Sequence, residues 1–191
     1  MDTPLPTTDI ATRAIEPDDL PALLAMNNAA VPNVSPLEAD ELAWLVRLAG
    51  VAEAVTVEGE VRGFVLALPP DTPYLSPNYL WFSRRYADFL YVDRIVVGEG
   101  RRSAGLGTAL YDVVFDRARR ADAPMVACEV NLEPPGMGLK PLQLLIERLK
   151  TSNESLVTVT WGFGEEDRLE RHQVFGEKII LGKPALERRH G

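Results

Sequence analysis

Seven runs of β-branched and other apolar residues recur along the chain, and each of them predicts a β-strand. The runs are residues 9–14, 51–57, 61–68, 89–97, 125–131, 156–161 and 174–181. The run at 89–97 is a strong one, so we expect that strand to be central in its sheet. Glu58-Gly59 stands between the second and third runs and predicts a hairpin.

Apolar residues at helical spacing predict four helices between these strands. The clearest covers residues 106–120, where one face carries Leu106, Ala109, Leu110, Val113, Val114 and Ala118. A first helix follows the acidic residues 16–19, a second runs from Ser35 to Gly50, and a last one starts near Lys140. The order of strands and helices predicts a mixed α/β sheet and does not match a repeating βα unit.

The start of the second helix has a defined capping pattern. Ser35 can cap the helix, Pro36 suits the first helical position, and Glu38 three residues after the serine completes a capping box. We therefore expect this helix to begin directly after Ser35.

The long connection at residues 69–88 is rich in aromatic residues, which are Tyr74, Tyr79, Trp81, Phe82 and Tyr86. Its length and composition are typical of a binding loop, and a packed surface loop is the alternative.

Composition and charge narrow the class of protein. The 191 residues are 46% hydrophobic and 25% charged, which is the balance of one globular domain spanning residues 1–191. No apolar run approaches the ~20 residues that span a bilayer, and residues 1–10 do not resemble a signal peptide. We expect a cytoplasmic protein without a membrane partner. The net charge of −8 disfavours nucleic acid and would attract a cationic substrate, although solubility alone also explains it.

The residues that bind metals or act as nucleophiles are scarce. Cys128 is the single cysteine, so it cannot form an internal disulfide, and its apolar surroundings predict a buried core residue. His172 and His190 are the two histidines. We expect no metal site, because one cysteine and two histidines do not make a zinc centre.

The segment with the clearest chemistry is residues 102–107, Arg-Ser-Ala-Gly-Leu-Gly, which follows a predicted strand and opens the 106–120 helix. Backbone N–H groups at a helix start lack partners within the helix, and Gly105 and Gly107 let a ligand approach them closely. The helix dipole also attracts an anion, so this segment predicts a pyrophosphate site. Its spacing matches neither the P-loop nor the Rossmann glycine pattern.

Arg102-x-x-Gly105-x-Gly107 resembles the Arg/Gln-x-x-Gly-x-Gly/Ala signature of the GNAT acetyltransferase superfamily. Residues 91–97 look like the fourth strand of that family and residues 125–131 like its fifth, and the likeness extends from Ile10 to about Pro135. It implies a mixed, mostly antiparallel twisted sheet of about six to seven strands. Strands 4 and 5 would splay apart, and helices would cover both faces. Within this family, the bacterial predicted acetyltransferases are the nearest in pattern.

The resemblance implies an N-acetyltransferase that uses acetyl-CoA as co-substrate and acts on a small-molecule or peptide amine. Ile95 and Val97 would offer backbone groups to the pantetheine arm, with Val96 between them. The pyrophosphate would bind at Arg102, Ser103, Ala104, Gly105, Leu106, Gly107 and Thr108. A homodimer stays open, as does a non-catalytic acyl-CoA sensor on the same fold.

Asp93 and Glu129 are the candidate general bases, because they would flank the gap between strands 4 and 5 if their faces agree. A structural salt bridge is the alternative for each of them. The match weakens after Pro135: members of the family often carry a later tyrosine as general acid, and no tyrosine follows Tyr111 here.

Overall fold

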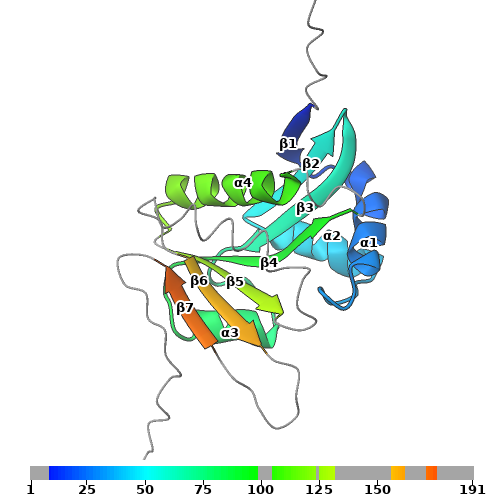
Figure 1. Cartoon of the computed structure of the whole chain (residues 1–191). Coiled ribbons are helices and arrows are strands. Elements are labelled where there is room, and N and C mark those ends of the chain that lie inside the picture. The colour runs from blue at the N-terminus through cyan, green and yellow to red at the C-terminus, as the bar shows by residue number, and fades with distance from the viewer. Residues whose placement is uncertain (1–8, 99–104, 124, 132–155, 162–170, 176–191) are drawn as a thin grey trace, which may run out of the picture. The chain divides into compact units, whose positions relative to one another are not determined.

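A computed structural model describes residues 9–98, 105–123, 125–131, 156–161 and 171–175 (Figure 1). The chain divides into two compact units, which are described in turn. The first unit contains Met1–Leu68 and Arg94–Arg117, and the second contains Pro69–Asp93 and Ala118–Gly191. The fourth strand, β4 (Leu90–Val97), contributes its first half to the second unit and its second half to the first.

Three antiparallel strands form the framework of the first unit. They are β1 (Ile10–Ala14), β2 (Val51–Val57) and β3 (Glu60–Leu68), with β2 between the other two. The predicted hairpin is confirmed: β2 and β3 are joined at Glu58 and Gly59, whose φ angles of 52° and 82° are those of a tight hairpin turn. The register between β2 and β3 shifts at Val55/Thr56, which marks an irregularity in the ladder.

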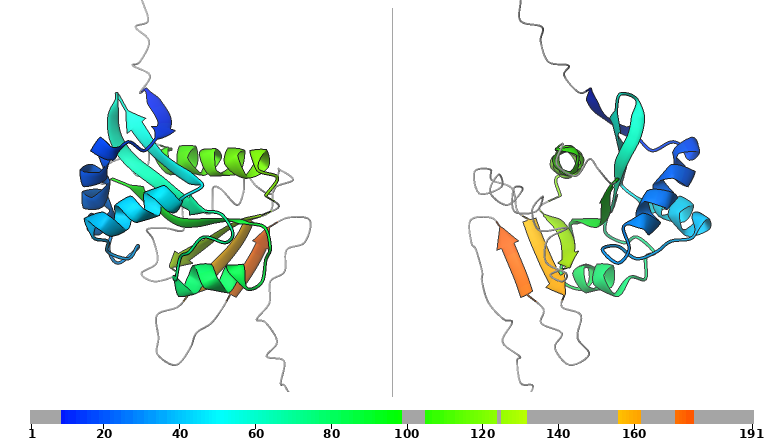
Figure 2. Two further views of the ribbon diagram at one scale, coloured as in Figure 1. Left: turned by 180° about the vertical axis from the view of Figure 1, so that it is seen from behind. Right: turned by 45° about the vertical axis from the view of Figure 1, so that its right-hand side comes forward.

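Helices cover both faces of these strands. A 3-10 turn, η1 (Pro17–Asp19), leads into α1 (Leu20–Ala29), and α1 and α2 (Ala39–Leu48) both contact β3. The helix α4 (Leu106–Arg120) belongs to the first unit as far as Arg117, and this part lies against the opposite face of the strands (Figure 2). The bounds of α4 are those expected from its apolar stripe, and Leu106, Leu110 and Val114 of that stripe are fully buried.

The predicted start of α2 is wrong by three residues. The helix begins at Ala39, and the capping box is formed by Glu38 and Glu41, each side chain accepting from the other's backbone N–H. Ser35 lies in the connection before the helix, where its carbonyl oxygen accepts a hydrogen bond from Asn27 Nδ2 at 3.1 Å. Two capping patterns overlap here, Ser35 with Glu38 and Glu38 with Glu41, and the helix uses the second.

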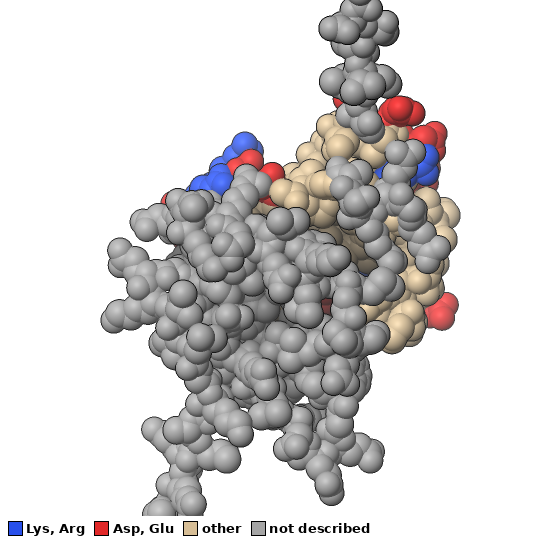
Figure 3. Space-filling model, viewed as in Figure 1, with Lys and Arg blue, Asp and Glu red and all other residues tan. Residues whose placement is uncertain are grey.

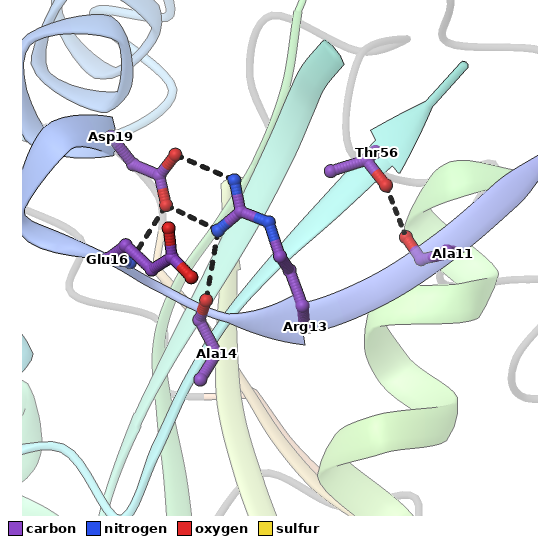
Figure 4. Close-up of polar contacts among 6 residues, drawn as sticks. All are labelled: Ala11, Arg13, Ala14, Glu16, Asp19 and Thr56. Atoms are coloured by element: carbon purple, nitrogen blue, oxygen red, sulfur yellow. Dashed lines mark hydrogen bonds and ion pairs between the residues drawn. The ribbon is translucent and has the colours of Figure 1, made fainter. Parts of the chain in front are cut away.

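A two-pronged ion pair connects β1 to the turn before α1 (Figure 4). Arg13 Nη1 and Nη2 donate to the Asp19 carboxylate at 2.6 and 2.8 Å, and Asp19 Oδ2 also accepts from Glu16 N at 2.8 Å. The hydrogen bond from Arg13 is the main reason that the pKa of Asp19 lies below its usual value.

The second unit combines the first half of β4 with β5 (Val126–Asn131), β6 (Leu156–Trp161) and β7 (Arg171–Phe175). The β4–β5 and β5–β6 pairs are parallel, and β6–β7 is antiparallel. Over both units, seven strands follow one another as neighbours in chain order, and three of the five pairings with a described register are antiparallel. The fold is therefore the mixed α/β arrangement that was expected.

The last predicted elements agree only in part. The strand expected at 174–181 begins earlier, at Arg171, because it pairs with β6 in the register Leu156↔Phe175 and Thr160↔Arg171. Residues 176–181 and the helix expected from Lys140 lie outside the described residues. Cys128 is buried, as predicted for a core residue.

The connection at 69–88 is not a loop throughout, because it contains the helix α3 (Pro77–Ser83). Tyr79 and Phe82 lie one turn apart on this helix and are each 1% exposed, and their rings contact Phe89 and Tyr91 at centroid distances of 5.5–6.3 Å. The aromatic residues of this connection thus serve packing, which was the alternative to a binding loop. The Tyr79 hydroxyl is also committed, since it donates to the carbonyl of Pro69 at 2.8 Å.

The C-terminal end of α4 carries a small group of basic side chains, seen in blue in Figure 3. Arg117, Arg119 and Arg120 are exposed there, with Asp116 beside them. Cations at this end offset the partial negative charge of the last helix carbonyls.

Candidate functional site

The second half of β4 carries the backbone groups assigned to the cofactor. Ile95 and Val97 are half-buried, and Val96 between them is 2% exposed, so the strand alternates as an ordinary β-strand does. Just beyond it, Gly98 N donates to Arg62 O of β3 at 2.8 Å. These residues all belong to the first unit.

Gly63 lets β3 and β4 come unusually close at this point. A Cβ atom at Gly63 would lie 2.6 Å from Val96 O and 3.3 Å from Val97 Cα, and both atoms belong to the β4 backbone. The position therefore requires glycine for reasons of space, and it fixes the β4 segment that follows Arg94.

The start of α4 is where the sequence predicts an anion site. Gly105 has a φ of +77°, a conformation that favours glycine, and no described atom lies within 4 Å of where its Cβ would be. Its carbonyl accepts from Ala109 N at 3.0 Å, so the N–H groups of Leu106, Gly107 and Thr108 precede the first one bonded within the helix. Three predicted members of the site, Arg102, Ser103 and Ala104, lie outside the described residues.

The two candidate carboxylates occupy equivalent positions on neighbouring strands. The parallel ladder pairs Leu90 with Val126 and ends at Val92↔Cys128, and the next residues along the two strands are Asp93 and Glu129. Because residues in the same register of parallel strands share a face, both positions belong to one face of the second unit. Asp93 is half-buried and forms polar contacts, while the side chain of Glu129 lies outside the description.

The β4–β5 ladder is short for the strands that form it. Only three residue pairs are made between the described parts of the strands, although β4 goes on to Val97 and β5 to Asn131. Beyond Cys128, β5 keeps pairing with β6 as far as Asn131↔Trp161. The separation expected between strands 4 and 5 stays a prediction, because Arg94–Val97 and β5 belong to different units.

Sequence reasoning missed Arg94, which the structure buries to 4% exposure. Its Nη1 donates to Asn27 Oδ1 at 2.8 Å, and Asn27 on α1 is itself fully buried. The signal that could have found it is the alternation of β4, since Arg94 occupies a buried position between Val92 and Val96.

Two classes of feature are absent from the part of the chain that the structure describes. No group of three or more histidine, cysteine or acidic residues there could hold a metal ion. Among the same residues, no helix is both long enough and apolar enough to cross a membrane.

Comparison with known proteins gives a consistent result. The sequence model of the acetyltransferase (GNAT) family matches residues 22–134, which include most of α1 and all of β4, α4 and β5. No curated protein sequence matches the chain.

Solved structures with this fold include an archaeal protein named Ard1 and two ribosomal-protein-alanine N-acetyltransferases. Ard1 from Thermoplasma volcanium superposes with a TM-score of 0.57 at 16% identity over 73% of this chain and 80% of its own. The ribosomal-protein-S18-alanine N-acetyltransferase from Escherichia coli gives 0.54 at 16% identity over 72% and 76%. The ribosomal-protein-alanine N-acetyltransferase from Brucella melitensis gives 0.54 at 17% identity over 72% and 89%. At these identities the likeness is one of fold.

Proposed function

Because this chain belongs to the acetyltransferase (GNAT) family, we propose that it transfers the acetyl group of acetyl-CoA directly to a primary amine. The observation that carries the proposal is the start of α4, where Gly105 at φ +77° opens a helix within the matched region, shortly after β4. Acetyl-CoA supplies the activated thioester, and the chain supplies the groups that bind it and remove a proton.

The residues at the helix start fit a pyrophosphate. The N–H groups of Leu106, Gly107 and Thr108 would donate to the phosphate oxygens, and the positive end of the helix dipole would add to the attraction. Gly105 and Gly107 leave the backbone uncovered, and Thr108 adds a hydroxyl donor. The backbone groups of Ile95 and Val97 would take the pantetheine arm as an added strand is taken.

The amine must lose a proton before it attacks the thioester carbonyl. With a pKa of ~10.4, only about one amine in 10³ is neutral near pH 7, which corresponds to roughly 4 kcal/mol. Asp93 or Glu129 would accept this proton directly or through water. The new C–N bond forms as the C–S bond breaks, and the departing thiolate takes up a proton. The net charge of −8 supports a cationic acceptor.

A non-catalytic acyl-CoA-binding module is the second candidate, and one sequence observation favours it. No tyrosine follows Tyr111, so the family's frequent general acid has no counterpart after that residue. The two functions share the binding step and differ in turnover, which allows one set of measurements to separate them.

The first measurement is binding. Acetyl-CoA at ~100 times its Kd should stabilise the protein by about 2.7 kcal/mol. That corresponds to a Tm increase of about 5–11 °C for a chain of this size. ATP, which lacks the pantetheine arm, should give a much smaller shift. No shift with millimolar acetyl-CoA would contradict both candidate functions.

A matched pair of variants locates the binding site. Gly107→Val should abolish the acetyl-CoA shift, because the side chain blocks access to the helix start. Ala109→Val is the control, since the Ala109 N–H is already bonded to Gly105 O and is not available to a ligand. Thiol release from acetyl-CoA across a panel of amines then tests turnover, and binding without any release would leave the sensor function.

A further inference from the structure

Arg94 is the one charged residue of β4 in a buried position, where the strand pattern calls for an apolar side chain. Val92, Arg94 and Val96 share one face of the strand and are 5%, 4% and 2% exposed. A buried guanidinium is costly unless its donors are satisfied, and a valine would fill this position without that cost. The arginine therefore has a role that packing alone does not explain.

The guanidinium reaches across to the last turn of α1 and to the connection that follows it. Its Nη1 donates to Asn27 Oδ1 at 2.8 Å and lies 3.5 Å from Ser35 O. Asn27 Nδ2 donates to the same Ser35 carbonyl at 3.1 Å and to Asn28 Oδ1 at 2.9 Å. One strand, one helix and one irregular connection thus share a single buried polar network.

Asn28 extends this network to the start of α2. Its Oδ1 accepts from Leu37 N and its Nδ2 donates to Leu37 O, both at 3.0 Å, which is the pattern that a neighbouring strand would offer. The connection over residues 30–38 contains no helix or strand of its own. The Asn27 and Asn28 side chains of α1 therefore give this connection hydrogen bonds of the kind that a neighbouring strand would offer, and Arg94 joins this network to β4.

The contact between Arg94 and Asn27 matters because of where Arg94 lies along β4. It is the second residue after Val92, where the described ladder with β5 ends. The segment that follows, Ile95–Val97, has β3 beside it through the close approach at Gly63 and the Gly98–Arg62 hydrogen bond. From Arg94 on, β4 is thus held by β3 along its edge and by the guanidinium on its buried face.

We propose that Arg94 is a positioning residue, which holds the Ile95–Val97 backbone in the geometry that binds the acyl-pantetheine by anchoring β4 to Asn27 and to the α1–α2 connection. The inference rests on the proposed function, since it concerns the same backbone groups. Arg94 touches neither the acetyl group nor the amine in this role, and acts through the strand that carries it.

The test compares Arg94→Met and Arg94→Lys with wild type and with Arg47→Met, a control that removes an exposed arginine from α2 of the same unit. Arg94→Met should raise the Kd for acetyl-CoA about tenfold or more, because small misplacements of binding groups are costly. Its Tm should fall by a few degrees, because the buried Asn27 Oδ1 loses its donor. Arg94→Lys should weaken binding less, because it keeps the charge and loses the planar fork. Arg47→Met should bind as wild type does.

Hydrogen exchange gives a readout that does not depend on acetyl-CoA. The Leu37 amide is protected by the Asn28 side chain, so Arg94→Met should speed its exchange about tenfold while the β1–β2 amides stay unchanged. Asn27→Asp keeps the acceptor for Arg94 but loses the Nδ2 donor to Ser35 O and Asn28 Oδ1, so it should bind acetyl-CoA nearly as wild type does while the Leu37 amide exchanges faster. If Arg94→Met does not fold, the same two measurements on Asn27→Asp and Arg94→Lys replace it.

The outcomes separate the inference from the function on which it rests. Wild-type affinity for acetyl-CoA in Arg94→Met would overturn the inference and leave the proposed function standing. An equal loss of affinity in Asp19→Asn, a variant destabilised away from β4, would also overturn it, because the effect would then follow from lower stability alone. A wild-type protein that does not bind acetyl-CoA would overturn the proposed function and the inference together.

Discussion

Gly63→Ala is the substitution whose effect the structure defines most closely. The added Cβ would lie 2.6 Å from Val96 O, which is 0.8 Å short of the 3.4 Å at which ordinary contact begins, and 3.1 Å from Val55 Cγ1. The obstructing atom is a backbone carbonyl, so it cannot rotate away as a side chain would. Either β3 or β4 must move.

The balance of energies predicts a net loss of stability. Overpacking in a well-packed core costs about 1–3 kcal/mol. Alanine in place of glycine recovers about 0.4–1 kcal/mol through the unfolded chain, because Gly63 does not have a positive φ. The steric cost is the larger effect, and we expect Tm to fall by about 2–8 °C at 2–4 °C per kcal/mol. Affinity for acetyl-CoA should fall about tenfold, since Val96 and Val97 are the residues displaced.

Calorimetric unfolding and equilibrium binding of acetyl-CoA provide the assays, with Gly98→Ala as the matched control. A Cβ at Gly98 would lie 3.4 Å from Arg62 O and 3.5 Å from Met26 Sδ, which are ordinary contacts. This control should keep its Tm and its affinity. If Gly63→Ala melts and binds as wild type does, the close approach of β3 to β4 does not exist in solution, and the reasoning is refuted.

Two further predictions concern charged side chains. At least one of Asp93→Asn and Glu129→Gln should lower kcat/KM by about 10²–10⁴-fold with little change in acetyl-CoA affinity, and the loss should shrink as pH rises because more acceptor amine is neutral. Near-full activity of both variants at pH 7 would exclude these residues as the base. Asp19→Asn should lower Tm at pH 7, because the pKa of Asp19 in the folded protein lies below its usual value. A lowered folded-state pKa stabilises the protein above the unfolded-state pKa of about 3.9, and this stabilisation is lost as pH falls through the folded-state pKa. The Tm difference between this variant and wild type should shrink as pH falls below about 3.9, and a difference that stays constant through that range would assign the effect to something other than ionisation.

The strands and the long helix could be predicted from the sequence because local pattern and tertiary environment agree there. Val51–Val57 is β-rich and joins the next strand through Glu58-Gly59, and the helix at 106–120 shows its full apolar stripe. The anion site expected from the glycine pattern before α4 stays a prediction. Gly105 has a positive φ there, a conformation that favours glycine.

Other features could not be predicted because long-range contacts decide them. Ser35 has the residue type and spacing of a helix cap, but it lies in the connection before the helix, where its carbonyl oxygen accepts a hydrogen bond from Asn27. The residues of α3 have modest helix propensity, and the helix is stabilised by Tyr79 and Phe82 packing on Phe89 and Tyr91. In the sequence Arg94 stands beside Asp93, but in the structure its side chain donates a hydrogen bond to Asn27, which is 67 residues away.

The interleaving of the two units along the chain has a consequence for synthesis on the ribosome. The first unit takes its parts from Met1–Leu68 and Arg94–Arg117, so residues 69–93 must be made before its last strand segment and α4 exist. Domains generally fold as units from the N-terminus during synthesis. Here the β1–β3 strands emerge early and remain without α4 on one face until about residue 117. A released fragment that ends at Leu68 should therefore leave uncovered the face of β1–β3 against which α4 lies in the whole protein.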